Sequence, residues 1–338
     1  MYVLYTDDSI LAGPDKNEIN KVISDIKKAK LDITVEGDIR DFLGVNIVKN
    51  KDGSITFSQP HLIDKILKAL GLDKEGVKPH DTPARSSVLI SRHSDSEDFQ
   101  QEFNYRSVIG MLGYLETTRS DISYATHQCA RFSSSPKVEH GKAIRWLGRY
   151  LLGTRDKGTT FRPDKSRGLE VYVDADFMGN WDPKEAANDR DTARSRHGYI
   201  INYCGCPIVT KSQLQTEVCL STTESEYTGL SYSLREAIPI IRLLDEMKGQ
   251  GIPVSSTKAA IHCKVFEDNS GALEIAKNPK YRPRTKHLNG RLHHFRSWVE
   301  SGRISIHKID TKEQCADYLT KAVPLDILRP LRKKVMGW

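Results

Sequence analysis

Apolar and polar residues alternate along residues 169–174 and then give way to carboxylates. A period of two is typical of a half-buried β-strand. Asp174 stands where the alternation ends, and Asp176 follows two positions later. We therefore expect Asp174 at the end of a strand, where the sheet meets solvent and a side chain is held rigidly enough to serve as a metal ligand.

The remainder of the C-terminal half combines strand and helix patterns. A charged insertion at 179–195 precedes two hairpin strands. Strands are predicted at 197–203, 206–212, 217–220, 260–266 and 303–309, and helices at 222–248, 269–277, 285–301 and 313–321. Antiparallel strands, then a helix, then alternating strands and helices predict an α/β domain with a mixed sheet and flanking helices.

The N-terminal part is predicted to be α+β. Apolar and aromatic arms in residues 1–13 indicate a hairpin whose turn holds Asp7 and Asp8. We expect both faces of these arms to be buried, with the two acids exposed at the tip. A helix capped by Asp15 comes next. It runs to about residue 30, and a second hairpin (41–48 and 54–58) and a helix (60–70) follow.

Between these parts lies a helical region. The apolar residues Val108, Leu112 and Leu115 recur at helical spacing. Helices are predicted at 104–118, 120–133 and 137–153, after a polar linker or loop at 71–104. At 338 residues the chain is too long for one ordinary domain. We expect segments at 1–70, 71–153, 154–168, 169–322 and 323–338, the third a linker and the last a basic tail.

The composition argues against a membrane protein and against a secreted protein. Apolar residues make up 38% of the chain, and no apolar run approaches the ~20 residues of a membrane span. The N-terminus lacks the pattern of a secretory signal, and six scattered cysteines suit reduced thiols. We therefore expect an intracellular protein, cytoplasmic or nuclear, that is not secreted and has no membrane partner.

Charge is unevenly distributed. The net charge is +7, yet residues 277–338 hold 15 Lys and Arg against 5 Asp and Glu. A basic segment beside carboxylates suits a polyanionic substrate held near metal ions. A solvated basic surface explains the charge equally well.

Three further acids can join Asp174. Glu226 lies near the start of the long helix, Asp268 follows a strand, and Asp317 lies in a late helix. If these four converge, they could hold two Mg²⁺ ions, with Mn²⁺ able to substitute, and support an in-line hydrolysis. Taken singly, each acid could be only a helix cap or a surface charge. Asp176 competes with Asp174, and Glu224 competes with Glu226.

The motifs around these acids resemble a known family. Val-Tyr-Val-Asp-Ala-Asp, Ser-Thr-Thr-Glu-Ser-Glu-Tyr, Val-Phe-Glu-Asp-Asn-Ser-Gly and Glu-Gln-Cys-Ala-Asp-Tyr-Leu-Thr-Lys are similar to the four acid motifs of copia-type LTR-retrotransposon RNase H domains. The resemblance favours Asp174 over Asp176 and Glu226 over Glu224. It implies an RNase H fold, which has a mixed five-stranded sheet with flanking helices, and cleavage of the RNA strand of RNA–DNA hybrids.

The N-terminal part also resembles this family. Tyr-Thr-Asp-Asp-Ser-Ile-Leu-Ala-Gly is similar to the catalytic box of its reverse transcriptase, which implies metal-binding roles for Asp7 and Asp8. The box opens this sequence. We therefore expect a Pol polyprotein fragment with a partial, inactive polymerase palm, a helical thumb or connection region and a complete RNase H domain. Upstream Pol segments would be its partners in a full-length element, which assembles into virus-like particles.

Between the third and fourth acids lies a basic segment that the family shares. Lys286, Arg291 and Arg296 could contact phosphates of a hybrid, and His287 could assist proton transfer or product release. The plain alternative is a basic helix face. The family usually has an acidic and an aliphatic residue where Asn289 and Gly290 stand. Asparagine and glycine have lower helix propensity, so we expect a weaker helix here. Two rival functions remain: a non-catalytic nucleic-acid-binding remnant, and a transposase-like nuclease acting on duplex DNA.

Overall fold

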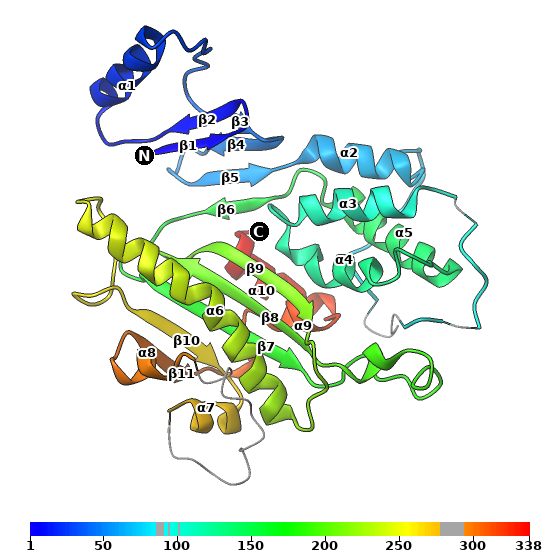
Figure 1. The fold of residues 1–338 in the computed structure, drawn as a ribbon. Coiled ribbons are helices and arrows are strands. Elements are labelled where there is room, and N and C mark those ends of the chain that lie inside the picture. Colours follow the sequence, from blue (N-terminus) through cyan, green and yellow to red (C-terminus); the bar gives the residue numbers. More distant parts are fainter. Residues whose placement is uncertain (86–90, 94, 101, 278–293) are drawn as a thin grey trace.

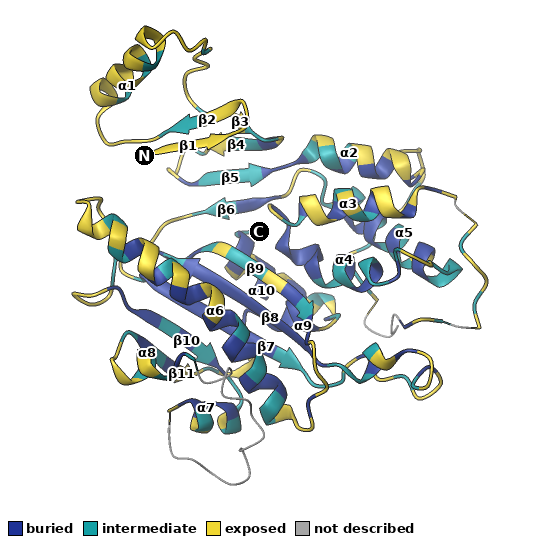
Figure 2. Ribbon diagram, viewed as in Figure 1, coloured by how far each residue is buried: buried dark blue, intermediate teal, exposed yellow. Residues whose placement is uncertain are grey.

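We describe a computed structural model of the chain, covering residues 1–85, 91–93, 95–100, 102–277 and 294–338. The N-terminal hairpin forms as predicted, with β1 (Tyr2–Tyr5) antiparallel to β2 (Asp8–Leu11). The prediction that its arms are buried is wrong. Tyr2, Val3, Leu4 and Tyr5 are all exposed, because these two strands form a separate two-stranded sheet (Figures 1 and 2).

Helix α1 (Lys16–Lys28) begins where predicted, and the Asp15 side chain accepts a hydrogen bond from the Asn17 backbone. A four-stranded sheet follows, in the order β3 (Asp41–Phe42), β4 (Val45–Lys49), β5 (Ile55–Ser58) and β6 (Thr159–Phe161). The single strand expected at 41–48 is divided by a tight turn at Leu43 and Gly44, both with positive φ. Strand β6 lies within the stretch expected to be a linker and pairs with β5.

The predicted helical region is present. It comprises α2 (Pro60–Ala69), α3 (Tyr105–Leu115), α4 (Ser123–Ala130) and α5 (Val138–Gly153). Their apolar faces share one core, in which Ile63, Leu112 and Ile144 are fully buried. The helical spacing seen in the sequence therefore marks one packed unit, named here the helical module.

The C-terminal half is built on a mixed five-stranded sheet, as predicted. Its strands are β7 (Leu169–Asp176), β8 (Arg196–Tyr203), β9 (Cys206–Leu214), β10 (Cys263–Glu267) and β11 (Ile304–Lys308). The order is β11-β10-β7-β8-β9. Strands β7, β8 and β9 are antiparallel neighbours, whereas β10 pairs in parallel with both β7 and β11. This is the topology of an RNase H-like sheet. Residues 217–220, expected to be a strand, form bends and irregular structure instead.

Helices cover both faces of this sheet (Figure 1). On one face α6 (Thr222–Gly249) and α7 (Ser270–Lys277) pack over Val171 and Val173. On the other, α9 (Asp317–Thr320) and α10 (Leu325–Met336) pack over Tyr172 and Ile200. The short helix α8 (Arg296–Glu300) precedes β11. The stretch expected to be a basic tail is therefore mainly a helix whose Leu328 side chain lies in the core. None of the helices in the described ranges is long and apolar enough to cross a bilayer.

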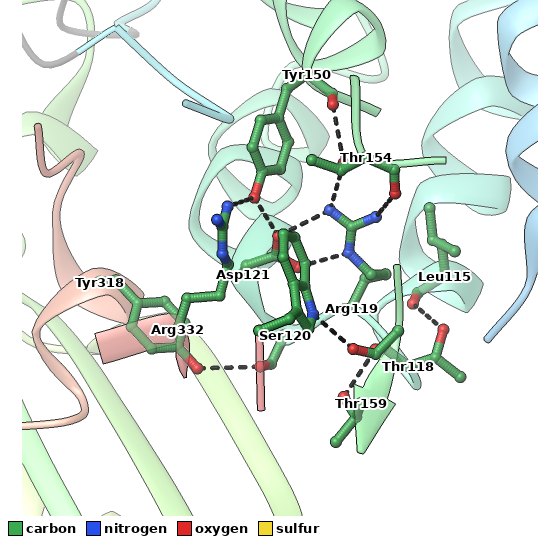
Figure 3. Close-up of polar contacts among 12 residues, drawn as sticks. Leu115, Thr118, Arg119, Ser120, Asp121, Tyr150, Thr154, Thr159, Tyr318 and Arg332 are labelled. Carbon is green, nitrogen blue, oxygen red and sulfur yellow. Dashed lines mark hydrogen bonds and ion pairs between the residues drawn. The ribbon is translucent and has the colours of Figure 1, made fainter. Parts of the chain in front are cut away.

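A buried polar network joins the helical module to the sheet domain (Figure 3). Arg119 donates two hydrogen bonds to the Asp121 carboxylate, at 2.9 and 2.8 Å. The Tyr150 hydroxyl donates to the same carboxylate and accepts from Arg332 of α10 at 2.7 Å. Burial alone would raise the pKa of Asp121, but the charge and hydrogen bonds of Arg119 outweigh burial and lower it. The network is therefore charged and hydrogen-bonded across the contact between the two parts.

Candidate active site

The site lies where two central parallel strands separate. Strands β7 and β10 pair in register as far as Tyr172 and Phe266. Asp174 and Asp268 each lie two residues beyond that pair. Because the carboxyl ends of parallel strands meet at one edge of a sheet, these two acids come together even though 94 positions separate them in the sequence.

The third acid comes from α6. Ser221 caps this helix by accepting from the Glu224 backbone at 3.1 Å, and the Glu224 carboxylate accepts from the Leu220 backbone at 2.8 Å. Ser221 and Glu224 have the spacing of a capping box, but Glu224 accepts from Leu220, the residue before the N-cap, and in this way it holds the helix start. Glu226 lies further into the helix and is only 8% exposed. Of the two glutamates, Glu226 is therefore the one that the helix directs toward the strand ends.

Asp174, Glu226 and Asp268 form one cluster, with one carboxylate oxygen from each lying within 4.8 Å of the others. Burial, and then the charge of Asp317, raises the pKa of Asp174 to about 7. Burial and the neighbouring Glu267 raise the pKa of Glu226 well above its usual value. Three carboxylates at this separation repel one another when ionised, so the cluster favours either protons or a cation.

The donor set fits a hard divalent cation. All three groups offer carboxylate oxygens, which are the ligands that Mg²⁺ prefers. Glu226 Oε2 is buried and meets no hydrogen-bond donor among the described residues. A buried carboxylate oxygen without a donor is costly unless a proton or a cation satisfies it. On chemical grounds the cluster is therefore suited to a metal.

Asp317 does not lie in this cluster of three. It opens α9, is 7% exposed, and forms an ion pair with Lys321 at 2.5 Å. Its charge nevertheless contributes to the raised pKa of Asp174. Thr320, on the same helix, donates a hydrogen bond to Asp174. Helix α9 thus borders the cluster, with Lys321 supplying a positive charge beside it.

Asp176, the sequence alternative to Asp174, is half-buried at the end of β7. Burial raises its pKa, whereas the charges of Lys321 and Arg196 oppose that rise. It is not among the acids that gather with Glu226 and Asp268 in the described part of the chain. The geometry therefore favours Asp174.

Sequence reasoning missed Glu267. This residue is fully buried in β10, and its Oε1 accepts from the Asn269 backbone at 3.0 Å. Burial raises its pKa to about 8. The strand period gave a usable signal, because Glu267 has the same parity as Cys263 and Val265 and so points toward α6. A buried acid beside the cluster adds to the negative charge that a cation would neutralise.

No protein-family model matches the chain. The chain is 32% identical over 329 residues to the Retrovirus-related Pol polyprotein from transposon TNT 1-94 of Nicotiana tabacum, covering 95% of this chain and 23% of that protein. It is 28% identical over 333 residues to the Pol polyprotein from transposon RE1 of Arabidopsis thaliana, covering 98% and 21% respectively. This chain is a relative of the copia-type retrotransposon Pol polyproteins.

The resemblance seen in the sequence is thereby confirmed. The chain spans less than a quarter of the length of these two Pol polyproteins. Among solved structures, the foamy viral protease-reverse transcriptase in complex with dsDNA matches with a TM-score of 0.49 and 14% identity, covering 92% of this chain and 55% of that one.

The Asp-Asp pair of the polymerase-like box lies elsewhere. Asp7 occupies the turn of the β1–β2 hairpin and Asp8 begins β2, and both are exposed. Figure 1 places this hairpin at the opposite end of the molecule from α7 and the strand ends. Within the described residues, the potential metal ligands that gather in a group of three or more are those of the RNase H-like domain, and neither Asp7 nor Asp8 is among them.

The basic segment of this Pol relative is described only in part. Lys286, His287 and Arg291 lie outside the described residues. Arg296 begins α8, donates to the backbone carbonyl of Ile275 at 3.5 Å and lies beside the Tyr227 hydroxyl. These contacts tie α8 to α7 and α6, so Arg296 has a structural contact in addition to its predicted one with phosphate.

Proposed function

We propose that this chain is a ribonuclease H that hydrolyses the RNA strand of RNA–DNA hybrids with Mg²⁺. The observation that carries the proposal is the convergence of Asp174, Glu226 and Asp268 at the end of an RNase H-like sheet. Kinship with Pol polyproteins supports it, because a nucleic-acid substrate suits that family.

The residues of the chain have separate tasks in this proposal. Asp174 and Asp268 would hold two Mg²⁺ ions between them, Glu226 would complete one site, and Asp317 would complete the other once Lys321 releases it. When bound, such ions lower the pKa of water and stabilise the leaving oxygen of the scissile phosphate. Mn²⁺ would substitute, because the oxygen donors accept either ion.

Substrate choice would depend on the shape of the hybrid and its 2′-hydroxyl groups rather than on base edges. We assign the phosphate contacts to the basic segment, with Lys286, Arg291 and Arg296 binding the backbone and His287 assisting proton transfer or product release. Upstream Pol segments would be further partners, and the protein would act inside the cell, in the cytoplasm or the nucleus.

A gel assay tests the proposal. A hybrid labelled on its RNA strand is incubated with the protein, with Mg²⁺ or with a chelator, beside a duplex DNA of the same sequence. Cleavage of the RNA strand alone, and only with metal, is the expected result. Binding without cleavage in either Mg²⁺ or Mn²⁺ would instead identify a nucleic-acid-binding remnant. Cleavage of the duplex DNA would indicate a transposase-like nuclease.

Asp174→Asn and Asp268→Asn serve as variants in the same assay. Each replaces a charged ligand by a neutral group of equal size, so the hybrid-binding surface is preserved. We expect cleavage to be abolished while the affinity for the hybrid stays within about twofold of the unmodified chain. Full cleavage by either variant would refute the assignment of these residues.

A further inference from the structure

A buried side chain bridges β7 and β10 just beyond the last residues that pair in register, a place named here the fork. Tyr172 and Phe266 are the last residues of β7 and β10 that pair in register. Gln314, which is fully buried directly after the short 3-10 helix Thr311–Glu313, fills this place. Its amide nitrogen donates to the Val173 carbonyl of β7 at 2.8 Å and lies 3.4 Å from the Phe266 carbonyl of β10.

The other end of the same amide holds α9. Gln314 Oε1 accepts from the Ala316 backbone at 3.3 Å, one residue before Asp317. A primary amide has two N–H donors and a carbonyl acceptor, so one Gln314 side chain can satisfy all three partners. Each of the three partners lies one or two residues before an acid in the sequence, namely Asp174, Asp268 or Asp317.

Two threonine side chains near Gln314 also hold the acids of the cluster. Thr311 donates to the Asp268 carboxylate at 2.7 Å, and Thr320 donates to Asp174. These bonds orient the carboxylates, whereas Gln314 holds the backbone from which they project. A buried amide costs free energy unless it is hydrogen-bonded, and an apolar side chain of the same length would fill the space. The hydrogen bonds, rather than the volume, therefore account for a glutamine here.

We propose that Gln314 is a positioning residue that fixes the separation of the Asp174 and Asp268 carboxylates, and so sets the affinity of the cluster for divalent cations. This inference rests on the proposed function. The acids repel one another in the absence of metal, and a strand fork without a bridge would relax by moving them apart. Metal sites tolerate only small errors in ligand placement, so a relaxed fork binds more weakly.

The test uses the full chain and the variant Gln314→Met, which keeps the length of the side chain but removes all three hydrogen bonds. Gln59→Met is the matched control, because Gln59 is also buried and makes a side-chain hydrogen bond, to Thr118, but lies at the start of α2. Mn²⁺ affinity is measured by calorimetry, the melting temperature by circular dichroism without metal, and hybrid affinity in a chelator.

We expect Gln314→Met to bind Mn²⁺ about tenfold more weakly and to need about tenfold more metal for half-maximal cleavage, with hybrid affinity unchanged. Gln59→Met should match the unmodified chain in metal affinity. Gln314→Asn, whose amide is one methylene shorter, serves if Gln314→Met does not fold, and its expected affinity is intermediate. The shorter asparagine side chain would reach the backbone of one strand but not of both.

The outcomes separate the two proposals. If the Gln314 variant binds Mn²⁺ within twofold of the unmodified chain, the positioning role is wrong, whether or not the chain cleaves hybrids. If Gln59→Met loses metal affinity to the same extent, general destabilisation explains the loss and the positioning role is also wrong. If the affinity depends on Gln314 but the unmodified chain cleaves no hybrid, the positioning role holds and the nuclease proposal fails.

Discussion

Glu224 and Glu226 lie two positions apart on α6 and have different tasks. Ser221 and Glu224 match the Ser-x-x-Glu spacing of a capping box, so the sequence alone allowed this glutamate to be assigned to the helix start. The pairing of Asp317 with Lys321 matches the (i, i+4) spacing of a helical ion pair and is therefore also encoded locally. The position of this pair beside Asp174 depends on how α9 docks, and no local pattern encodes the docking.

Lys321 carries a prediction at this scale. Burial alone would lower the pKa of its ammonium group, but the neighbouring Asp174, Asp317 and Asp176 outweigh burial and raise the pKa. Lys321→Met should destabilise the metal-free protein by about 1 kcal/mol, since the lysine side chain is 45% exposed and solvent screens the pair. Urea unfolding in a chelator measures the loss.

Saturating Mg²⁺ should reduce that loss, because the cation then neutralises the same carboxylates. Lys308→Met changes an exposed lysine of β11 in the same way and should have little effect under either condition. Equal losses with and without metal would show that Lys321 does not compensate the charge of the cluster.

For the individual helices and strands, the sequence predicted which kind of element forms better than it predicted how deeply that element is buried. The hairpin β1–β2 formed where apolar residues predicted it, yet its arms are exposed because burial depends on a covering partner and not on the strand itself. The many basic residues predict a tail where α10 lies, although Leu328, Leu331 and Val335 recur at helical spacing. The basic residues between these apolar positions make the amphipathic pattern of α10 hard to recognise in the sequence. Strand β6 is three residues long, too short for a period to be recognised.

Helix α5 provides a pH-dependent prediction. His140 Nδ1 accepts from the Lys137 backbone at 2.9 Å, and Nε2 lies 2.8 Å from the Ser91 carbonyl. This arrangement needs a neutral ring, and burial lowers the His140 pKa from 6.5 to about 4. The contribution of this group is therefore fully present above pH 6.5 and is lost as the pH falls toward 4.

His140→Gln removes the titration, so we compare the two proteins by urea unfolding from pH 7.5 to 4.5. The stability advantage of histidine over glutamine should shrink by up to about 3 kcal/mol across that range. Other titrating groups are common to both proteins and cancel in the difference. Parallel pH profiles would mean that His140 is not held neutral by the fold.

At the scale of the whole molecule, the helical module and the sheet domain are held together by buried polar groups. Ser120 and Tyr318 share a hydrogen bond of 3.0 Å across the contact, and the Trp338 indole donates to the Gly158 carbonyl at 2.6 Å. The Arg332 guanidinium lies 3.8 Å from the Trp338 ring centroid. Sequence patterns could not reveal these partners, because each pair joins residues more than 100 positions apart or depends on the docked helix α10.

Tyr150→Phe tests this contact. It deletes a hydroxyl that connects Asp121 with Arg332, so the buried Asp121 carboxylate loses one of its donors and Arg332 Nη1 loses its acceptor. We expect a loss of about 1 to 3 kcal/mol in the free energy of unfolding. Tyr5→Phe makes the same chemical change on the exposed hairpin and should stay within about 0.5 kcal/mol. Similar values for the two variants would show that the network adds nothing to stability.

In the proposed function, the clustered carboxylates perform the hydrolysis. Glu226→Gln and Glu224→Gln are therefore compared in single-turnover cleavage of a labelled RNA–DNA hybrid at saturating Mg²⁺. We expect Glu226→Gln to cleave at least about 100-fold more slowly with unchanged hybrid affinity, and Glu224→Gln to stay within about threefold of the unmodified chain. Full-rate cleavage by Glu226→Gln would show that the cluster does not perform the hydrolysis.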